Sequence, residues 1–166
     1  MIIGVTGHRN LEHSEALIKT KLTNLLTDLN CKKLITGMAI GFDIVCAETA
    51  IDLDIPFVAA VPFVEQAKAW SSEQQKRYMN ILEKASEIYI HPSPEKEMNT
   101  KQRMLYGFFG RNSWIADNSE ILVAYLIKED GGTKHCWDCA GKKNKKRINL
   151  ADCLTDSPGS CKEEEK

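Results

Sequence analysis

Short apolar runs alternate along the chain with longer segments whose apolar residues recur at helical spacing. The runs predict strands at residues 2–6, 33–36, 57–61, 88–90 and 120–127, the third of them buried, with a further edge strand at 147–150. The segments between them predict helices at residues 14–29, 42–53, 72–85, 101–118 and 133–143, the third opening with a Ser-Ser-Glu-Gln cap pattern. The first of these helices carries one continuous apolar stripe, formed by Leu17, Ile18, Leu22, Leu25, Leu26 and Leu29.

This alternation of strands and helices favours a parallel sheet with helices on both faces. We therefore expect an α/β fold, a Rossmann-like three-layer sandwich with a mostly parallel central sheet. A length of 166 residues predicts one domain, which we place at residues 1–150. Residues 151–166 form a polar, cysteine-containing tail that we expect to be loosely ordered from Pro158 onward.

Composition and charge exclude several classes of protein. Hydrophobic residues make up 43% of the chain and charged residues 27%, which is ordinary for a soluble globular protein. The formal net charge of −1 gives no overall attraction to nucleic acid or anionic lipid. No apolar run approaches the roughly 20 residues needed to span a bilayer, and the chain starts on a strand pattern without a basic leader. We expect a cytoplasmic protein that does not enter the membrane.

Six cysteines allow two interpretations. Cys31 and Cys46 lie in apolar surroundings and are expected to be small buried side chains. The thiols of Cys136, Cys139, Cys153 and Cys161 could together hold zinc, but the first pair lies in a predicted helix and the second pair is widely spaced. We therefore predict no metal, no cofactor and, in a reducing compartment, no structural disulfide.

Three predicted strands end in glycine-containing loops. In open α/β sheets such loops lie at the edge where ligands bind, and the helix behind each loop presents free N–H groups to an anion. The alternative for each is a plain turn with its side chains in solvent, and Asp43 could cap a helix as well as accept from ribose hydroxyls. The candidate ligand-binding residues in these loops are Gly7, His8, Arg9, Gly37, Met38, Ala39, Gly41, Asp43, Gly131, Gly132 and Thr133.

Two further segments carry candidate ligand contacts. After the strand at 57–61, Pro62 begins a stretch in which Gln66 and Trp70 would share one helical face, so that Trp70 could stack on a base while Gln66 contacts its polar edge. Packing of Trp70 over the sheet edge is an equal alternative. Arg111 and Asn112 follow a glycine near a sheet edge, where the arginine could bind phosphate through two nitrogens or be an ordinary surface residue.

These motifs together resemble the SLOG superfamily. The resemblance rests on Thr-Gly-His-Arg at residues 6–9, Thr-Gly-Met-Ala-Ile-Gly-Phe-Asp at 36–43, Pro-Phe-x-x-Gln-x-x-x-Trp at 62–70, and Arg-Asn at 111–112 leading to Gly-Gly-Thr at 131–133. It covers about residues 1–150 and is closest to the YpsA-like (DUF1273) branch. It implies a Rossmann-like fold, a nucleotide-derived ligand and assembly into homo-oligomers, in bacteria or their phages.

The LOG branch of the same superfamily contains phosphoribohydrolases, which cleave the N-glycosidic bond of nucleotides. Arg111 matches an arginine of that branch, but the glutamate that follows its Gly-Thr motif is missing here, where Lys134, His135 and Cys136 follow instead. Cleavage of a glycosidic bond needs a carboxylate. We therefore expect binding of a ligand such as an ADP-ribose, cyclic or NAD-related nucleotide. The alternative is hydrolysis, with Arg111 on the phosphate and His135 or Asp43 as the catalytic base.

One basic run, residues 142–147, suggests a third possibility. DprA proteins of the same superfamily bind single-stranded DNA, and the lysines of this run could contact a backbone. The alternative is a solvated helix end. Because the run lacks interleaved aromatic residues and the net charge is −1, we expect no nucleic-acid partner.

Overall fold

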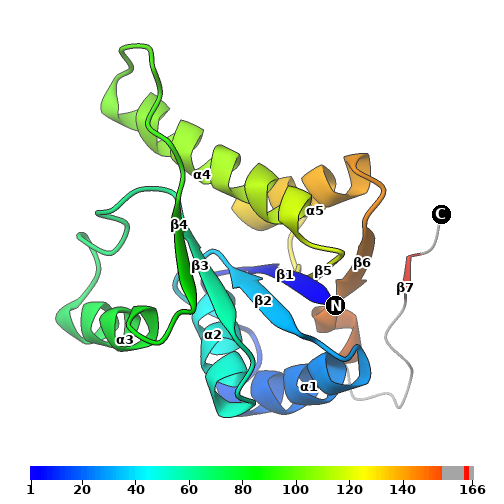
Figure 1. Ribbon diagram of the computed structural model, residues 1–166. Helices are drawn as coiled ribbons and strands as arrows, with labels where there is room; N and C mark the ends of the chain where they lie inside the picture. The colour runs from blue at the N-terminus through cyan, green and yellow to red at the C-terminus, as the bar shows by residue number, and fades with distance from the viewer. Residues whose placement is uncertain (155–162, 165–166) are drawn as a thin grey trace.

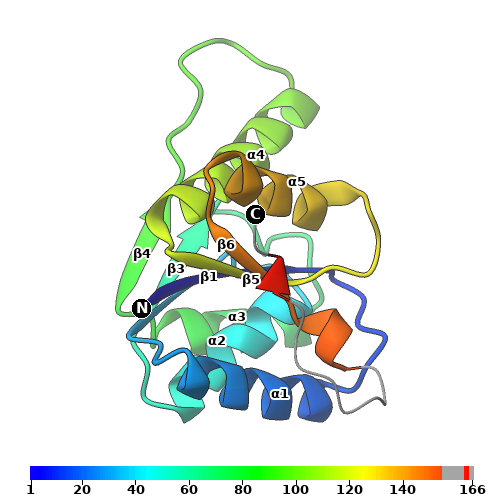
Figure 2. The same ribbon diagram turned by 90° about the vertical axis from the view of Figure 1, so that its right-hand side faces the viewer.

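A computed structural model describes residues 1–154 and 163–164 and shows a seven-stranded sheet between two layers of helices (Figures 1 and 2). The strand order is β4-β3-β2-β1-β5-β6-β7, and every neighbouring pair is parallel except β6 with β7. The strands are β1 (Ile2–Gly7), β2 (Lys33–Thr36), β3 (Phe57–Val61), β4 (Glu87–Ile90), β5 (Ile121–Tyr125), β6 (Lys146–Asn149) and β7 (Glu163–Glu164). The predicted Rossmann-like architecture is confirmed.

The helices divide between the two faces of this sheet. Figure 2 shows α1, α2 and α3 on one face and α4 and α5 on the other. Their bounds are α1 (Glu15–Asp28), α2 (Phe42–Asp52), α3 (Ser72–Leu82), α4 (Thr100–Asn118) and α5 (Gly131–Lys142), followed by a 3₁₀ turn, η1 (Leu150–Cys153). None of the described helices combines the length and hydrophobicity that a transmembrane span requires.

Two hydrophobic clusters fill the space between the layers. Ile18, Leu22 and Leu26 of the predicted α1 stripe are fully buried under the sheet, whereas Leu17 is 38% exposed. On the opposite face, Ile115 of α4 and Trp137 of α5 belong to the second cluster. Because apolar surface is buried on both faces of the sheet, the inner strands β3 and β5 are continuous apolar runs and not alternating ones.

Several local predictions are confirmed and others are wrong. Ser71 and Gln74 form a capping box at the start of α3, and Cys31 and Cys46 are buried free thiols. Residues 62–70 form turns and not a helix, so Gln66 and Trp70 do not share a helical face. The strand at 146–149 is not an edge strand, because β7 pairs with it.

The order of the strands determines where a ligand can bind. The chain builds β1 to β4 outward in one direction and then crosses to the other side of β1 to add β5 and β6. At such a switch point, the loops that follow the two central strands separate and leave a crevice at the carboxyl edge of the sheet. Here the switch point lies between the loops after β1 and β5.

Candidate functional site

A cavity of about 320 Å³ lies at this switch point, between the loops after β1 and β2 and residues of α4 and α5. We call it the crevice. Most of the predicted loop residues meet there, together with side chains of α4. Its lining residues are Thr6, Gly7, His8, Arg9, Ala39, Asp43, Leu105, Phe108, Phe109, Arg111, Asn112, Gly132 and Thr133.

Arg111 is the central cation of the crevice, although it is only 5% exposed. Its Nη1 donates to the carbonyl oxygen of Gly37 and, at 3.3 Å, to that of Ala60, while its Nε donates to Asn112 Oδ1 at 2.9 Å. These bonds fix the plane of the guanidinium. Within the described part of the chain, Nη2 has no hydrogen-bond partner. The guanidinium is therefore held rigidly and keeps a donor for a ligand.

Asp43, in the first turn of α2, is the one carboxylate among the residues that line the crevice. Its Oδ2 accepts from the N–H of Ala39 at 3.4 Å, and its buried Oδ1 has no partner among the described residues. Burial raises the pKa of this carboxyl to about 6, and Arg111 opposes the shift. The side chain thus fixes the loop after β2 and also presents a free oxygen.

The glycines of the first two loops serve packing more than ligand approach. A Cβ on Gly7 would collide with the side chain of Phe42, and one on Gly37 would collide with the Arg111 guanidinium. Gly41, with a φ of +88°, packs against the carbonyl oxygens of His8 and Arg9. These contacts hold the loops after β1 and β2 together, and no local sequence pattern predicts them.

The third glycine loop is open to the crevice. A Cβ on Gly132 would meet only Asn112 Nδ2 at 3.9 Å, and one on Gly131 would meet nothing within 4 Å. Both residues begin α5, and Asp130 gives the helix no side-chain cap. The carbonyl of Gly132 accepts from Asn112 Nδ2 at 3.0 Å, which ties the loop to α4. An uncapped helix start at this position suits an anion.

His8 and Arg9 differ in their freedom. His8 Nε2 accepts from the N–H of Lys128 at 3.1 Å, and burial lowers the pKa of the imidazole below its ordinary value. His8 is therefore a neutral residue at pH 7 that joins the loops after β1 and β5. Arg9 is exposed, and its guanidinium makes no hydrogen bond or ion pair with another described residue.

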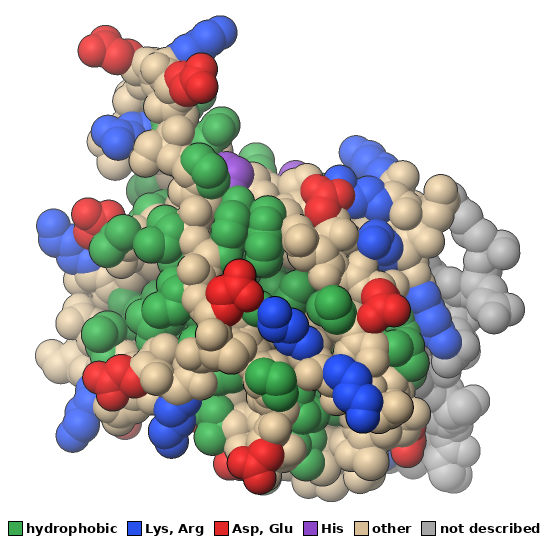
Figure 3. Space-filling model, in the orientation of Figure 1, with side chains coloured by type: hydrophobic (Ala, Val, Ile, Leu, Met, Phe, Trp, Pro, Cys, Tyr) green, Lys and Arg blue, Asp and Glu red, His purple; other side chains and the backbone are tan. Residues whose placement is uncertain are grey.

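The apolar wall of the crevice comes from Leu105, Phe108 and Phe109 of α4, none of which was predicted as a site residue. Their helical spacing is visible in the sequence, but it is equally typical of a side that faces the core. Leu105 and Phe109 are 43% and 42% exposed. Figure 3 shows further hydrophobic side chains gathered over β4 and α4, on the face turned toward the viewer.

Comparison with known proteins agrees with this architecture. The profile of the YspA SLOG family, YpsA, matches residues 4–155. The chain belongs to this family. The SPbeta prophage-derived protein YoqJ of Bacillus subtilis (strain 168) is 30% identical over 132 residues, which cover 73% of this chain and 76% of YoqJ. Membership of the SLOG family supports a nucleotide-related binding role in general terms.

Two solved structures share the fold. DNA processing protein A from Helicobacter pylori superposes with a TM-score of 0.64 at 16% identity, over 89% of this chain and 63% of that chain. The protein of the same name from Streptococcus pneumoniae gives a TM-score of 0.62 at 14% identity, over 93% of this chain and 53% of that chain. The SLOG chain described here thus spans less than two thirds of either protein.

Other predicted site residues of this SLOG protein lie outside the crevice. Gln66 is buried, and its Nε2 donates to the carbonyl oxygens of Gly37 and Met38 at 3.2 and 2.9 Å. Met38 is itself buried, with a φ of +56°. Trp70 and Gly41 line a neighbouring cavity of about 520 Å³. Pro62 lines a third cavity, of about 220 Å³, beside α4.

His135 and the candidate zinc ligands are also separate from the crevice. The His135 ring stacks on Phe109 with centroids 4.3 Å apart and contacts Cys139 Sγ at 3.8 Å. Cys136 is buried, and Cys153 is disulfide-bonded, so the prediction of no disulfide is wrong there. Cys161 lies outside the described residues. Among those described, no group of three or more His, Cys, Asp or Glu side chains could hold a metal ion.

The basic run at the end of α5 is engaged with neighbouring residues. Lys143 forms an ion pair with Asp117, and Lys145 Nζ donates to the carbonyl oxygen of Asp117 at 3.5 Å. The guanidinium of Arg147 lies over the ring of Trp137, 4.7 Å from its centroid. These contacts give the run a role in joining α4, α5 and β6.

Proposed function

We propose that this SLOG protein binds a nucleotide-derived small molecule in the crevice, with its phosphate between Arg111 and the start of α5. The observation that carries the proposal is the arrangement of Arg111, whose guanidinium is buried and fixed while Nη2 is unpaired among the described residues. A buried cation is costly to maintain, and a bound anion would offset that cost. The open Gly131-Gly132 loop is tied to the same helix through Asn112.

Binding without turnover is the function that the lining residues favour. Cleavage of a glycosidic bond generally uses two carboxyl groups. Asp43 is the single carboxylate that lines the crevice, and its Oδ2 is occupied by the loop after β2. The protein would accordingly sense or sequester an ADP-ribose, cyclic or NAD-related ligand.

Hydrolysis of the N-glycosidic bond is the second candidate, and one observation favours it. Burial places the pKa of Asp43 at about 6, close to that of a general base at neutral pH, and its Oδ1 is free of described partners. Of the two candidate bases, Asp43 is the better placed, because His135 stacks on Phe109 and does not line the crevice.

Isothermal titration calorimetry with AMP, ADP-ribose, NAD and a cyclic dinucleotide tests the proposal. We expect one of these ligands to bind the wild-type protein and to lose at least about tenfold in affinity in Arg111→Lys, since lysine lacks the planar guanidinium. Arg103→Lys is the matched control, because Arg103 lies on α4 beside a different cavity. A folded protein that binds none of the four contradicts the proposal. Release of free base from the bound ligand would establish hydrolysis instead.

We further propose a cytoplasmic homo-oligomer without a nucleic-acid partner. The H. pylori protein binds single-stranded DNA, but in this chain Lys143, Lys145 and Arg147 already contact neighbouring residues. Association of copies is supported by four exposed apolar residues, Ile88, Ile90, Met104 and Tyr106. Sedimentation velocity, with and without a single-stranded oligonucleotide, tests both statements. A monomer contradicts the homo-oligomer, and a complex with the oligonucleotide contradicts the absence of a nucleic-acid partner.

A further inference from the structure

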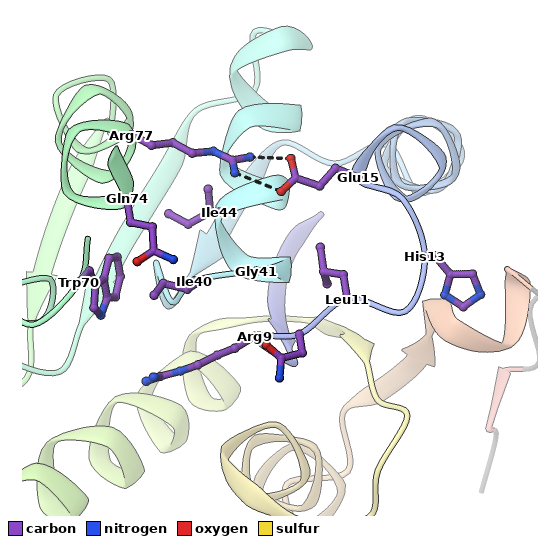
Figure 4. Close-up of a pocket in the computed structure, with 11 residues that line it drawn as sticks. Arg9, Leu11, His13, Glu15, Ile40, Gly41, Ile44, Trp70, Gln74 and Arg77 are labelled. Carbon is purple, nitrogen blue, oxygen red and sulfur yellow. Dashed lines mark hydrogen bonds and ion pairs between the residues drawn. The ribbon is translucent and has the colours of Figure 1, made fainter. Parts of the chain in front are cut away.

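The larger cavity next to the crevice has the features of a base-binding pocket. Figure 4 shows it between the loop after β1, the start of α2 and the start of α3, with Trp70, Ile40 and Gln74 on one side and Arg9 below them. Its volume is about 520 Å³, within the range of small-molecule sites. We call it the Trp70 pocket.

Trp70 is held in place as a wall of this pocket. Its carbonyl oxygen accepts from Gln75 Nε2 at 3.0 Å, and its ring packs edge-to-face on buried Tyr78, with centroids 5.3 Å apart. The indole remains partly exposed beside Ile40. A fixed, partly exposed indole next to an aliphatic side chain can stack on a planar ring.

Gln74 offers a hydrogen-bond donor to the polar edge of a ring that stacks on Trp70. The Oε1 of Gln74 accepts from the N–H of Ser71 at 3.1 Å, whereas its Nε2 makes no hydrogen bond with another described residue. One amide donor thus stands beside the indole. Gln66, which the sequence suggested for this task, has its Nε2 occupied by two backbone carbonyls.

The charges of the Trp70 pocket are distributed unevenly. At its far end Arg77 pairs with Glu15, at 3.1 and 2.8 Å (Figure 4). Arg77 also pairs with Glu48 Oε1 at 2.7 Å. These carboxylates already neutralise Arg77. Arg9, by contrast, has no ion pair with a described residue, and it lines both the Trp70 pocket and the crevice. Arg9 is therefore the cation available to an anionic ligand, and it lies where the two cavities meet.

We infer that a single ligand occupies both cavities, with a planar heteroaromatic base against Trp70 and a phosphate-bearing sugar in the crevice. This inference rests on the proposed function, because the crevice must hold the phosphate. Arg9 then contacts the phosphate linkage that connects the two parts. The ligand class is a nucleotide with a second sugar–phosphate unit, as in nucleoside diphosphate sugars, and not a base-free sugar phosphate.

The test compares ADP-ribose with ribose 5-phosphate, which represents the part without the base. We expect ADP-ribose to bind the wild-type protein at least about tenfold more tightly, because stacking of one base on an aromatic side chain contributes on this scale. The ratio of the two dissociation constants should fall by about tenfold in Trp70→Leu, because only stacking is lost, and stay close to the wild-type ratio in Trp70→Phe. Thermal melting of each variant checks its folding.

Fluorescence supplies a second readout that a purely structural role would not change. The chain contains three tryptophans, and stacking on Trp70 should quench its emission when ADP-ribose binds. Ribose 5-phosphate should give no quenching, and neither ligand should give it in Trp70→Phe.

The outcomes separate this inference from the proposed function. Equal affinity for both ligands, or an unchanged ratio in Trp70→Leu, overturns the base pocket and leaves nucleotide binding in the crevice intact. Failure of both ligands to bind the folded wild-type protein overturns the base pocket. The proposed function is overturned as well only if AMP, NAD and the cyclic dinucleotide also fail to bind.

Discussion

Arg111 and Asp43 both crowd the position that a side chain of Gly37 would occupy, without forming an ion pair with each other. A Cβ on Gly37 would overlap Arg111 Nη1 and lie 2.7 Å from Asp43 Oδ2. Both side chains are almost fully buried, at 5% and 4% exposure. Opposite charges in this arrangement stabilise each other across the glycine, while each side chain keeps an atom available for a ligand.

Gly37→Ala should therefore reduce both stability and binding. The added methyl group would displace the guanidinium from the carbonyl oxygens of Gly37 and Ala60, and overpacking of this kind costs about 1–3 kcal/mol of unfolding free energy. Urea denaturation measures this loss, and calorimetry with the nucleotide that binds the wild-type protein should show a fall in affinity of at least about tenfold.

Gly132→Ala is the matched control for stability, because its Cβ would meet only Asn112 Nδ2 at 3.9 Å. In the first turn of α5, alanine should leave the unfolding free energy unchanged or raise it by up to about 1 kcal/mol. If both alanine variants lose the same stability, the contact between Gly37 and Arg111 is not the cause.

The difference between these glycines also shows how far the sequence alone could lead. Strand and helix positions follow from local patterns, so that Leu22 and Leu26 could be placed in the core directly. Glycine is needed at position 37 because the side chain of Arg111, 74 residues further along the chain, occupies the space of a Cβ. No local sequence pattern contains this contact. A glycine in a loop predicts a turn. Which side chain packs into the space that the missing Cβ leaves is determined by tertiary packing.

Gln66 and Trp70 illustrate the same limit. Their spacing predicted a shared helical face, but residues 62–70 form turns, and the two side chains separate. Gln66 donates hydrogen bonds to backbone carbonyls of the loop after β2, while Trp70 lines the Trp70 pocket. The sequence could suggest an aromatic ring and an amide on the wall of one cavity, but only the fold shows that Gln74 is the amide that lines a cavity with Trp70.

The stability of the protein should depend on pH through Asp43. Burial raises the pKa of this carboxyl from 3.8 to about 6, so the folded protein binds the proton more tightly than the unfolded chain does. As pH rises from about 4 to about 6, the free energy of unfolding should thus fall by roughly 3 kcal/mol through this group alone. Above pH 6 the contribution of Asp43 should stay constant. Urea denaturation at pH 4.5, 6 and 7.5 measures it.

Asp43→Asn removes the titrating group and should flatten the pH dependence between about 4 and 6. Amide and carboxyl groups are similar in shape, and the oxygen of the new amide can still accept from the N–H of Ala39. An equal slope in the wild-type protein and in this variant would show that other groups determine the dependence.

His135→Ala tests whether His135 has a role in ligand binding or catalysis. Because the imidazole stacks on Phe109 and does not line the crevice, its loss should change ligand affinity by less than about twofold, which corresponds to less than roughly 0.5 kcal/mol. A loss of turnover in His135→Ala, with binding retained, would restore His135 as a catalytic base.

Asn112→Ala, by contrast, removes the hydrogen bonds to Arg111 Nε and to the Gly132 carbonyl and should weaken binding by at least about tenfold.

Tyr125→Phe should loosen the loop after β1 without touching the crevice directly. The Tyr125 hydroxyl accepts from the N–H of Glu12 at 3.1 Å and bonds His13 Nδ1 at 2.8 Å, and its ring stacks on Phe42. Phenylalanine preserves the stack but removes the hydrogen bonds to the loop, and because Glu12 is exposed, their loss should cost about 0.5–1.5 kcal/mol for each bond. Hydrogen exchange should therefore accelerate at Glu12 and His13, next to the Trp70 pocket, while the amides of α5 keep their protection. Uniform acceleration across both regions would mean that the hydroxyl stabilises the whole domain and not this loop.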